Sequence, residues 1–533
     1  MPFINESPVD SNKYFINGIM EEVLNNLQSI KDFRVLSRTS TDQYKDPDRP
    51  TITEIAKKLN VNYVVEGSGQ KYGNKFRLRV QLIRAKGKET HIWGKSYEKE
   101  IRETNDIFSI QSQIAEAIAT ELKATIVPEE KQLIEKTSAT NLTAYDFYTR
   151  GREELKKYRS DNNNKLSLRK AEDLYHKALE NDPAFAPAYI GLAYVYWTKH
   201  GNEEYFSRNY LDSVLFLCNK ALSFDNQLSE AYTLRGSYYE EVGKAEQAIK
   251  EFDKAIKLNP NDWAAYWNTG GYYSWAYIDL VKSIYNLQKA ASLNHGLELP
   301  AILKGVSDVY CHAGFPEKAK YYCQEKLKLD DDSCAYYSSL SDFEFWFANH
   351  NKAIEFGVKV YSIDSTNEGI FYKLGIAYAR LGQYEEALKY YKKYIERLKT
   401  QGRLSEIDGI NVGYVYWQNG KKEEAEYYFK FAQTKDLIRA NELKRLGSVA
   451  RYNYYDLATI FAFRGEKDEA FRNLRIFNQI QRVPLWIATS IKNIPLFDSI
   501  RSEPEFQQIV KEVETKYQAE HERVRKWIEE QGK

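Results

Sequence analysis

Apolar residues in the first 127 positions follow two different spacings. A spacing of three or four residues predicts an amphipathic helix entered through residues 10–12, and a second helix is expected after residues 50–51. Short apolar runs at residues 33–37 and from Tyr63 onward predict strands. The residues that define the first helix are Ile16, Ile19, Val23, Leu27 and Ile30.

Alternation of apolar and polar residues predicts a β-hairpin in the middle of this segment. Phe76, Leu78, Val80 and Leu82 alternate with polar residues, as in a strand with one solvated face. Gly73-Asn74 precedes them and supplies the turn. The nearby glycines join two strands instead of opening a helix, so we predict a hairpin and not a phosphate loop. A strand at 91–97 and a helix at 104–126 complete a small α/β domain.

After a polar connection at 128–143, the sequence repeats with a period of about 34 residues. One unit contains Gly236, Ala248, Phe252 and Pro260, in which small residues allow two helices to cross and an aromatic ring fills the gap beside them. This pattern matches the tetratricopeptide repeat, and about nine helix pairs are expected over 144–480, with insertions near 159–166 and 200–208. Residues 481–533 are polar enough on the outside to form a helical cap.

A series of short motifs runs through the amino-terminal domain. In chain order they are Pro2-Phe3, Tyr14-Phe15 with Gly18, residues 34–40 (RVLSRTS), residues 59–68 (LNVNYVVEGS), Val80-Gln81-Leu82-Ile83, Ile92-Trp93, Ser96-Tyr97 and Asp106-Ile107-Phe108. With these motifs the domain resembles a known bacterial family, the TolB-like (FlgO-type) domain. That resemblance implies an α/β domain that often precedes tetratricopeptide repeats, behind a DNA-binding or cyclase domain and often a membrane span.

The expected fold is therefore mainly α: a tetratricopeptide-repeat (TPR) superhelical solenoid at 144–480, preceded by a small α/β domain at 1–127. In proteins of the TolB-like family, several apolar residues precede the Pro-Phe pair and complete the first strand. Here Met1 stands in their place. We therefore expect the chain to be a fragment of a longer protein, with an output domain upstream.

Composition excludes several classes of partner. Lys plus Arg is 76 and Asp plus Glu is 75, so no net field favours nucleic acid, and none is expected to bind this chain. No apolar run reaches the ~18–20 residues of a membrane span, and no signal peptide is visible. The chain is expected to be soluble, in the cytoplasm or the periplasm. The sequence does not indicate an oligomeric state for the chain.

Chemistry-bearing residues are scattered. The seven histidines show no metal-ligand spacing, and no nucleophile elbow, kinase loop or Walker motif occurs. The four cysteines, Cys218, Cys311, Cys323 and Cys334, are too few and too unevenly spaced for a disulfide framework or a zinc site, and we expect them to be buried apolar side chains. We predict no metal, no cofactor and no enzymatic activity.

The concave face of the repeats is the predicted binding surface for a protein or peptide. Aromatic side chains there would not be needed for packing within a repeat and offer large contact area with little entropy to lose. The alternative is that tight winding buries them against neighbouring repeats. Lys304, Asp308 and Asp342 do not make the basic set of a carboxylate clamp. The predicted binding residues are Tyr194, Trp197, Trp267, Phe345, Tyr372, Ile376, Tyr414, Trp417 and Tyr455.

Two functions remain open at this point. The first is a non-catalytic interaction or sensor module of a bacterial signalling or transcription protein. The second is a structural or assembly protein of the cell envelope. The upstream sequence would separate them, since a DNA-binding or cyclase domain favours the first and a lipoprotein signal favours the second.

Overall fold

The computed structural model describes residues 1–7, 13–45, 48–137, 139–160, 164–201, 210–442 and 451–532. These residues form two compact units, which are described one at a time. Unit 1 comprises Met1–Val242, Glu246–Asn268 and Lys289–Leu299, and unit 2 comprises Gly243–Ala245, Thr269–Gln288 and Pro300–Lys533.

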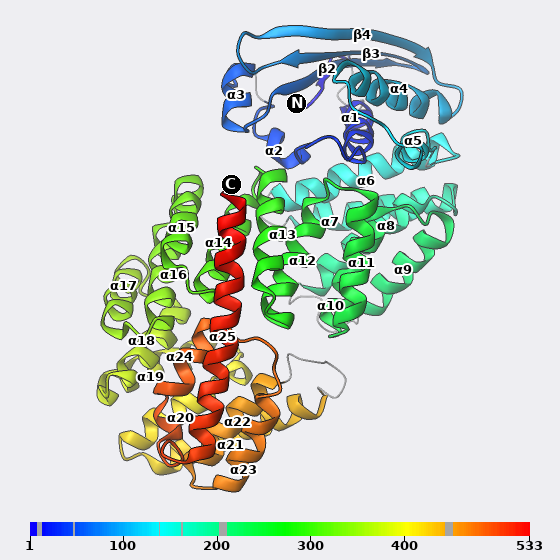
Figure 1. Cartoon of the computed structure of the whole chain (residues 1–533). Coiled ribbons are helices and arrows are strands. Elements are labelled where there is room, and N and C mark those ends of the chain that lie inside the picture. The colour runs from blue at the N-terminus through cyan, green and yellow to red at the C-terminus, as the bar shows by residue number, and fades with distance from the viewer. Residues whose placement is uncertain are drawn as a thin grey trace. The chain divides into compact units, whose positions relative to one another are not determined.

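Unit 1 begins with a sheet of four strands in the order β1-β2-β3-β4. β1 runs parallel to β2, and the other neighbours are antiparallel. Helices α1 and α4 pack against each other on one face of this sheet (Figure 1). The elements are β1 (Ile4–Asn5), α1 (Lys13–Gln28), α2 (Arg38–Asp42), α3 (Ile52–Lys58), β2 (Tyr63–Tyr72), β3 (Lys75–Arg84), β4 (Thr90–Glu100) and α4 (Asn105–Glu121).

The alternation along β3 determines which face of the sheet is buried. Phe76, Leu78, Val80 and Leu82 are each at most 2% exposed and pack under α1 and α4, whereas Arg79 on the other face is exposed. The hairpin between β2 and β3 turns at Gly73, whose φ of +61° favours glycine. The predicted hairpin and α/β domain are therefore observed.

Two details of the predicted domain are wrong. Residues 33–37 form no strand, because their backbone groups bond to the repeats: Val35 N–H donates to Asn261 Oδ1 and Ser37 N–H to the Leu293 carbonyl. The helix expected to reach residue 126 ends at Glu121, just before Lys123 adopts a φ of +56°. The predicted helix entry at residues 10–12 lies outside the described residues.

In the described residues, nine successive helix pairs follow, from α6 to α23 (Figure 1). The polar connection before them contains the short helix α5 (Pro128–Ile134). Parts of both predicted insertions, 161–163 and 202–208, lie outside the described residues. The pairs are α6 (Leu142–Ser160) with α7 (Lys165–Asn181), α8 (Ala186–His200) with α9 (Leu211–Phe224), α10 (Ser229–Glu241) with α11 (Ala245–Leu258), α12 (Trp263–Tyr272) with α13 (Leu280–Leu293), α14 (Leu299–His312) with α15 (Pro316–Asp330), α16 (Ser333–Trp346) with α17 (His350–Ile363), α18 (Glu368–Arg380) with α19 (Tyr384–Thr400), α20 (Gly409–Gln418) with α21 (Lys422–Glu442), and α22 (Arg451–Phe463) with α23 (Lys467–Phe477).

Small residues bring the two helices of a pair together. A Cβ on Gly236 would lie 2.5 Å from the ring of Phe252, and one on Gly375 would lie 2.7 Å from the ring of Tyr391. Both rings are fully buried, so neither can move aside. Where Ser341 occupies this position, its hydroxyl donates to the Ala353 carbonyl of the facing helix at 2.8 Å. The repeat spacing seen in the sequence therefore reflects close helix crossings.

Unit 2 ends with helix α24 (Leu485–Asn493), the 3₁₀ turn η6 (Pro495–Phe497) and the long helix α25 (Pro504–Gln531). Ile487, Ile491 and Phe497 are completely buried and join the apolar cluster of the preceding repeats. Among the described residues, no helix combines the length and the apolar character needed to cross a bilayer.

Candidate functional site: the inner faces of the repeats

Three of the predicted binding residues lie in unit 1. Tyr194 and Trp197 are half-buried on α8, and the guanidinium of Arg159 lies 5.8 Å from the centre of the Tyr194 ring. Burial raises the pKa of Tyr194, and nearby carboxylates add to this effect. Trp267 on α12 is half-buried and stacks on Trp263 at 5.8 Å.

The other six lie in unit 2, and three of them are core residues. Ile376, Tyr414 and Tyr455 are 8%, 4% and 4% exposed. Tyr455 donates to Ser490 of α24 at 3.2 Å, and α24 also packs against α16. The expectation that these side chains are not needed for packing is therefore wrong for these three, because they belong to the buried apolar cluster that joins the last repeats with α24.

Phe345, Tyr372 and Trp417 are less completely covered. Phe345 and Tyr372 are half-buried and pack against the same apolar cluster, which includes Ile487 and Ile491 of α24. Trp417 is 36% exposed and is the most accessible of the six. Partner binding by any of these residues stays a prediction.

Trp417 is held in a rigid aromatic group. Its ring meets that of Phe463 edge to face, with centroids 5.4 Å apart, and Phe463 meets Tyr414 in the same way at 5.8 Å. Lys422 lies 5.1 Å above the Trp417 ring, a favourable position for an ammonium group. Trp417 therefore presents an exposed ring with little freedom to reorient.

A polar strip crosses the inner side of α18 and α20. The hydroxyl of Tyr372 donates to Asp408 at 2.6 Å, and Asn411 Nδ2 donates to the same carboxylate oxygen at 2.8 Å. Asp408 also caps α20 by accepting from two backbone amides. Arg380 donates to Asn411 at 3.3 Å. This strip fixes the Tyr372 ring, and burial together with Asp408 raises the pKa of Tyr372.

The basic residues that a carboxylate clamp would use are already paired. Lys304 contacts both oxygens of Asp308 at 2.6 Å, and Lys373 contacts Asp342 at 2.8 Å. Their charges are compensated within the repeats, which agrees with the sequence interpretation that no such clamp is formed.

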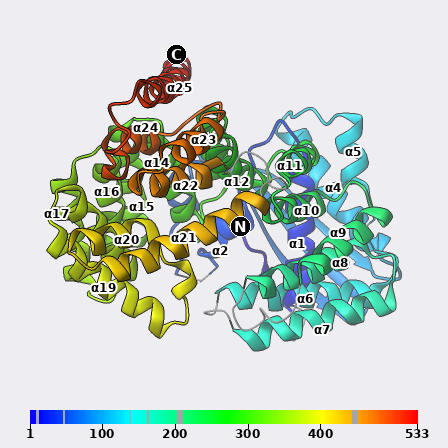
Figure 2. The same ribbon diagram turned by 90° about the horizontal axis from the view of Figure 1, so that it is seen from below.

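In unit 1, the α/β domain itself occupies the inner side of the first repeat. Helix α1 lies beside α6 (Figures 1 and 2), and a Cβ on Gly18 would come within 2.8 Å of the Thr149 side chain. Only glycine permits this approach without displacing Thr149. The conformation of α1 is thus tied to that of the repeats.

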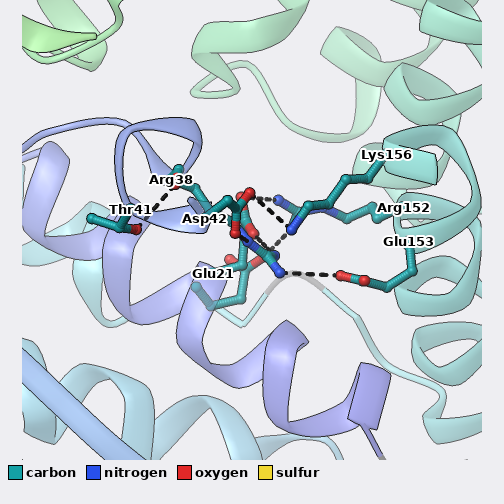
Figure 3. Close-up of polar contacts among 8 residues, drawn as sticks. Glu21, Arg38, Thr41, Asp42, Arg152, Glu153 and Lys156 are labelled. Carbon is teal, nitrogen blue, oxygen red and sulfur yellow. Dashed lines mark hydrogen bonds and ion pairs between the residues drawn. The ribbon is translucent and has the colours of Figure 1, made fainter. Parts of the chain in front are cut away.

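An ionic network, which we call the junction, surrounds this contact (Figure 3). Arg152 of α6 lies 2.8 Å from Glu21 and 3.2 Å from Glu22 of α1. Arg38 pairs with Glu21 and lies 3.2 Å from Glu153 of α6. Its other members are Asp42, 3.6 Å from Arg38, and Lys156, 2.8 Å from Asp42.

The electrostatics of the junction favour the ionised form of Glu21, whereas burial raises the pKa of Glu22. Burial alone would raise the pKa of Glu21, but the guanidinium groups of Arg38 and Arg152 outweigh it and lower that pKa to about 2. The side chains of Arg38 and Glu21 are only 12% and 16% exposed. Removing one partner would therefore leave a poorly solvated charge.

Hydrogen bonds between side chains and backbone groups extend the junction along the segment after α1. Asn261, between α11 and α12, is 1% exposed; its Nδ2 donates to the Gln28 carbonyl at 2.9 Å and its Oδ1 accepts from Val35 at 3.0 Å. Ser40 Oγ accepts from His295 N–H at 2.7 Å. Sequence reasoning missed these contacts. The available signal was the adjacent pair Glu21-Glu22 on the predicted amphipathic helix, matched by Arg152 and Lys156 in the first repeat.

Next to the junction, a carboxylate begins helix α12. Asp262 accepts from the amides of Ala264 and Ala265 at 3.1 Å and from the Thr233 hydroxyl at 2.9 Å. Burial raises its pKa from the ordinary value of 3.8 to about 6, and Glu230 adds to the rise.

No catalytic arrangement is evident among the described side chains. The four cysteines are free thiols, three of them buried, and the described His, Cys, Asp and Glu residues form no group of three or more that could hold a metal ion.

Comparison with known families identifies both parts of the chain. Residues 1–117 match the second domain of HilA/YgeH-like transcriptional regulators. Residues 229–262 and 369–400 match tetratricopeptide repeats.

Two curated relatives match parts of the chain. A putative adenylate cyclase 3 of Rhizobium meliloti (strain 1021) is 29% identical over 203 residues, or 38% of this chain and 33% of the relative. The mitochondrial import receptor subunit TOM70 of Rattus norvegicus is 33% identical over 91 residues, or 17% of this chain and 13% of that protein. The chain thus spans a third or less of the length of these relatives.

Solved repeat proteins resemble parts of the chain in architecture. YrrB, described as a TPR protein with an unusual peptide-binding site, is 20% identical with a TM-score of 0.26, covering 35% of this chain and 95% of its own. A tetratricopeptide repeat protein from Parabacteroides merdae is 16% identical with a TM-score of 0.37, covering 50% and 98%. The family matches and the observed helix pairs lead to one description: a HilA-like regulator domain followed by tetratricopeptide repeats.

Proposed function

We propose that this chain is the non-catalytic interaction and sensing module of a bacterial regulatory protein, and that a protein or peptide partner binds its repeats. The regulator-domain match and the repeats support this assignment. Within it, we propose that the amino-terminal domain is also akin to TolB-like domains, on the motifs quoted above, and that a longer protein carries an output domain upstream.

The main observation in support of the partner site is that the Trp417 ring is both exposed and held in one orientation. Of the nine predicted residues, all of which are described, it is the most exposed, yet Phe463 and Lys422 restrict its ring. An aromatic side chain that is already ordered loses little entropy when a partner covers it. We therefore place the anchor of the partner site at Trp417, at the end of α20 opposite to its cap Asp408.

The junction gives this module a route for a signal. Because Arg152 and Lys156 belong to the first repeat while Glu21 and Asp42 belong to the regulator domain, a change in the first repeat acts directly on that domain. The proposed role of the α/β domain is to report the state of the repeats to the upstream output domain.

The test begins with cross-linking and mass spectrometry to identify a partner, followed by titration of the purified partner. Loss of a central aromatic anchor typically weakens binding by about 2 kcal/mol, or roughly thirtyfold. Trp417→Ala should show this loss while the thermal melt stays almost unchanged. Tyr321→Ala is the matched control, since Tyr321 is 55% exposed on α15, elsewhere in unit 2.

Two results would count against the proposal. Equal partner affinity for Trp417→Ala and the wild type would move the binding surface away from this residue. A collapse of the melt would show that Trp417 is needed for packing. If the identified partner is an envelope assembly factor instead of a signalling or transcription component, the structural role replaces the regulatory one.

A further inference from the structure

The connection between α12 and α13 has an unusual backbone. After α12 the chain forms a π-helical turn at Tyr273–Tyr277, closed by a hydrogen bond from Asp279 N–H to the Tyr273 carbonyl at 3.0 Å. Ile278 then adopts φ +50° and ψ +36°, the left-handed region. A β-branched residue rarely takes this conformation, and π-turns are uncommon, so the surroundings must hold the turn in place.

Helix α25, more than 220 residues later, supplies those surroundings. Glu520 is 1% exposed, and its Oε1 accepts from Leu280 N–H at 2.8 Å. Arg523 contacts Asp279 at 3.1 Å and Glu520 at 2.5 Å. Arg482, before α24, lies 3.5 Å from Asp279 and 3.4 Å from Glu520. Two carboxylates and two guanidinium groups therefore fix the residues that directly follow Ile278.

The same part of α25 holds a second turn, between α14 and α15. His521 Nδ1 lies 2.7 Å from the Ala313 carbonyl, and its ring stacks on Phe315 at 4.6 Å. Gly314 has φ +83°, and a Cβ there would come within 2.1 Å of the Tyr517 hydroxyl. Glycine is thus required at position 314 both for its backbone and for the contact with α25.

The first half of α25 is attached elsewhere. Arg475 of α23 makes two contacts with Glu505, at 2.7 and 2.9 Å. Lys516 donates to Asn478 Oδ1, just after α23, at 2.7 Å. One straight helix therefore connects the last repeat pair of unit 2 with two turns that come much earlier in the sequence.

We propose that residues 517–523 of α25 form a latch that keeps the turn at residues 273–278 in its strained conformation, so that unit 2 has a latched and an unlatched state. In the latched state, Glu520 supplies the acceptor for Leu280 N–H, and Arg523 and Arg482 hold Asp279. In the unlatched state, the turn loses these constraints and Ile278 leaves the left-handed region.

Amide hydrogen exchange of the full chain tests the latch. Glu520→Ala removes the acceptor for Leu280 N–H and one partner of each arginine. We expect exchange of the amides of residues 277–283 to accelerate by at least about tenfold, as for a segment that opens locally. Arg475→Ala is the matched control, because it releases the first half of α25 from α23. It should leave exchange at residues 277–283 unchanged.

A second variant separates a latch from simple loss of packing. Ile278→Gly removes the backbone strain, since glycine adopts positive φ readily. In that background, Glu520→Ala should accelerate exchange at residues 277–283 by a clearly smaller factor. Equal acceleration in both backgrounds would mean that α25 stores no strain in the turn. Unchanged exchange in the single Glu520→Ala variant would also overturn the proposal.

Discussion

Arg152 on the first repeat helix and Glu21 on the first helix of the regulator domain lie 2.8 Å apart. Arg152 occupies an inward position of the repeat, of the kind that free repeat proteins offer to a partner. Here the inward position is used within the chain, because α1 packs against α6. The first repeat is therefore committed to the chain's own regulator domain.

Breaking the junction should destabilise unit 1. Arg38→Met leaves Glu21, Asp42 and Glu153 without this guanidinium. Removing one partner of a buried pair costs ~3–5 kcal/mol, and the partial exposure of Arg38 lowers the expected loss to about 2 kcal/mol. Urea unfolding measures it, and exchange at residues 33–42 should accelerate.

An exposed ion pair of the same domain provides the control for Arg38→Met. Arg77 lies 2.8 Å from Glu98, with side chains 39% and 54% exposed. Arg77→Gln should leave the free energy of unfolding almost unchanged, because both partners of this pair are well solvated. If both variants lose the same stability, the junction is no stronger than a surface pair.

The close helix crossings predict an asymmetric response to alanine. Gly236→Ala would place a Cβ 2.5 Å from the buried Phe252 ring, and such overpacking costs ~1–3 kcal/mol, more than the gain in helix propensity. Gly271→Ala meets no atom within 4 Å and should be neutral or stabilising by up to ~1 kcal/mol. Thermal melts compare the two, and limited proteolysis of Gly236→Ala should cut first within 229–258. Equal melts would show that the crossing tolerates a methyl group.

Asp262 should make unit 1 more stable in mild acid. Its pKa is about 6 in the folded chain and 3.8 ordinarily, so the folded state binds the proton more tightly. The stability from this group is fully present below about pH 4 and is lost as the pH rises through about 6. Asp262→Asn keeps a side-chain oxygen that accepts from the amides of Ala264 and Ala265. The Thr233 hydroxyl can accept from the new side-chain amide, because it also donates to the Ser229 carbonyl. The free energy of unfolding of Asp262→Asn should exceed that of the wild type by about 2 kcal/mol at pH 7.5, and the difference should disappear toward pH 4.

Asp364 supplies a control of opposite sign. Hydrogen bonds from the Thr366 hydroxyl and amide lower the pKa of Asp364. Its contribution to stability is present at neutral pH and is lost as the pH falls through the folded pKa. Asp364→Asn should therefore be less stable than the wild type at pH 7.5 and should converge with it in acid. Unfolding curves of both variants across this pH range should show opposite trends, and parallel trends would contradict the assignment.

Local patterns in the sequence were sufficient for the repeats and the hairpin. Gly236 with Phe252 and Gly375 with Tyr391 are each separated by 16 residues, and this fixed spacing reflects contacts within one helix pair. Phe76 and Leu78 likewise report the pleat of their own strand. Such features depend on neighbours along the chain, so periodicity reveals them.

Contacts between distant segments were not predictable in the same way. Val35 and Leu36 are residue types that favour a strand. The Val35 N–H instead donates to Asn261 Oδ1, 226 positions away. Tyr455 fits an inward recognition position, but α24 covers it through Ser490. In both cases the residue type is compatible with two environments, and the choice is made by a segment far away in sequence.

Helix α25 has 28 residues, which span about 42 Å at 1.5 Å per residue. Helix α25 is attached both to α23 and to the turns at 279–280 and 313–315. Its length therefore fixes the distance that the intervening repeats must span. Gain or loss of a repeat in that interval would leave the helix too short or too long for its second attachment. Open arrays change repeat number readily in the course of descent, whereas in this part of the chain the repeat number and the length of α25 can change only together.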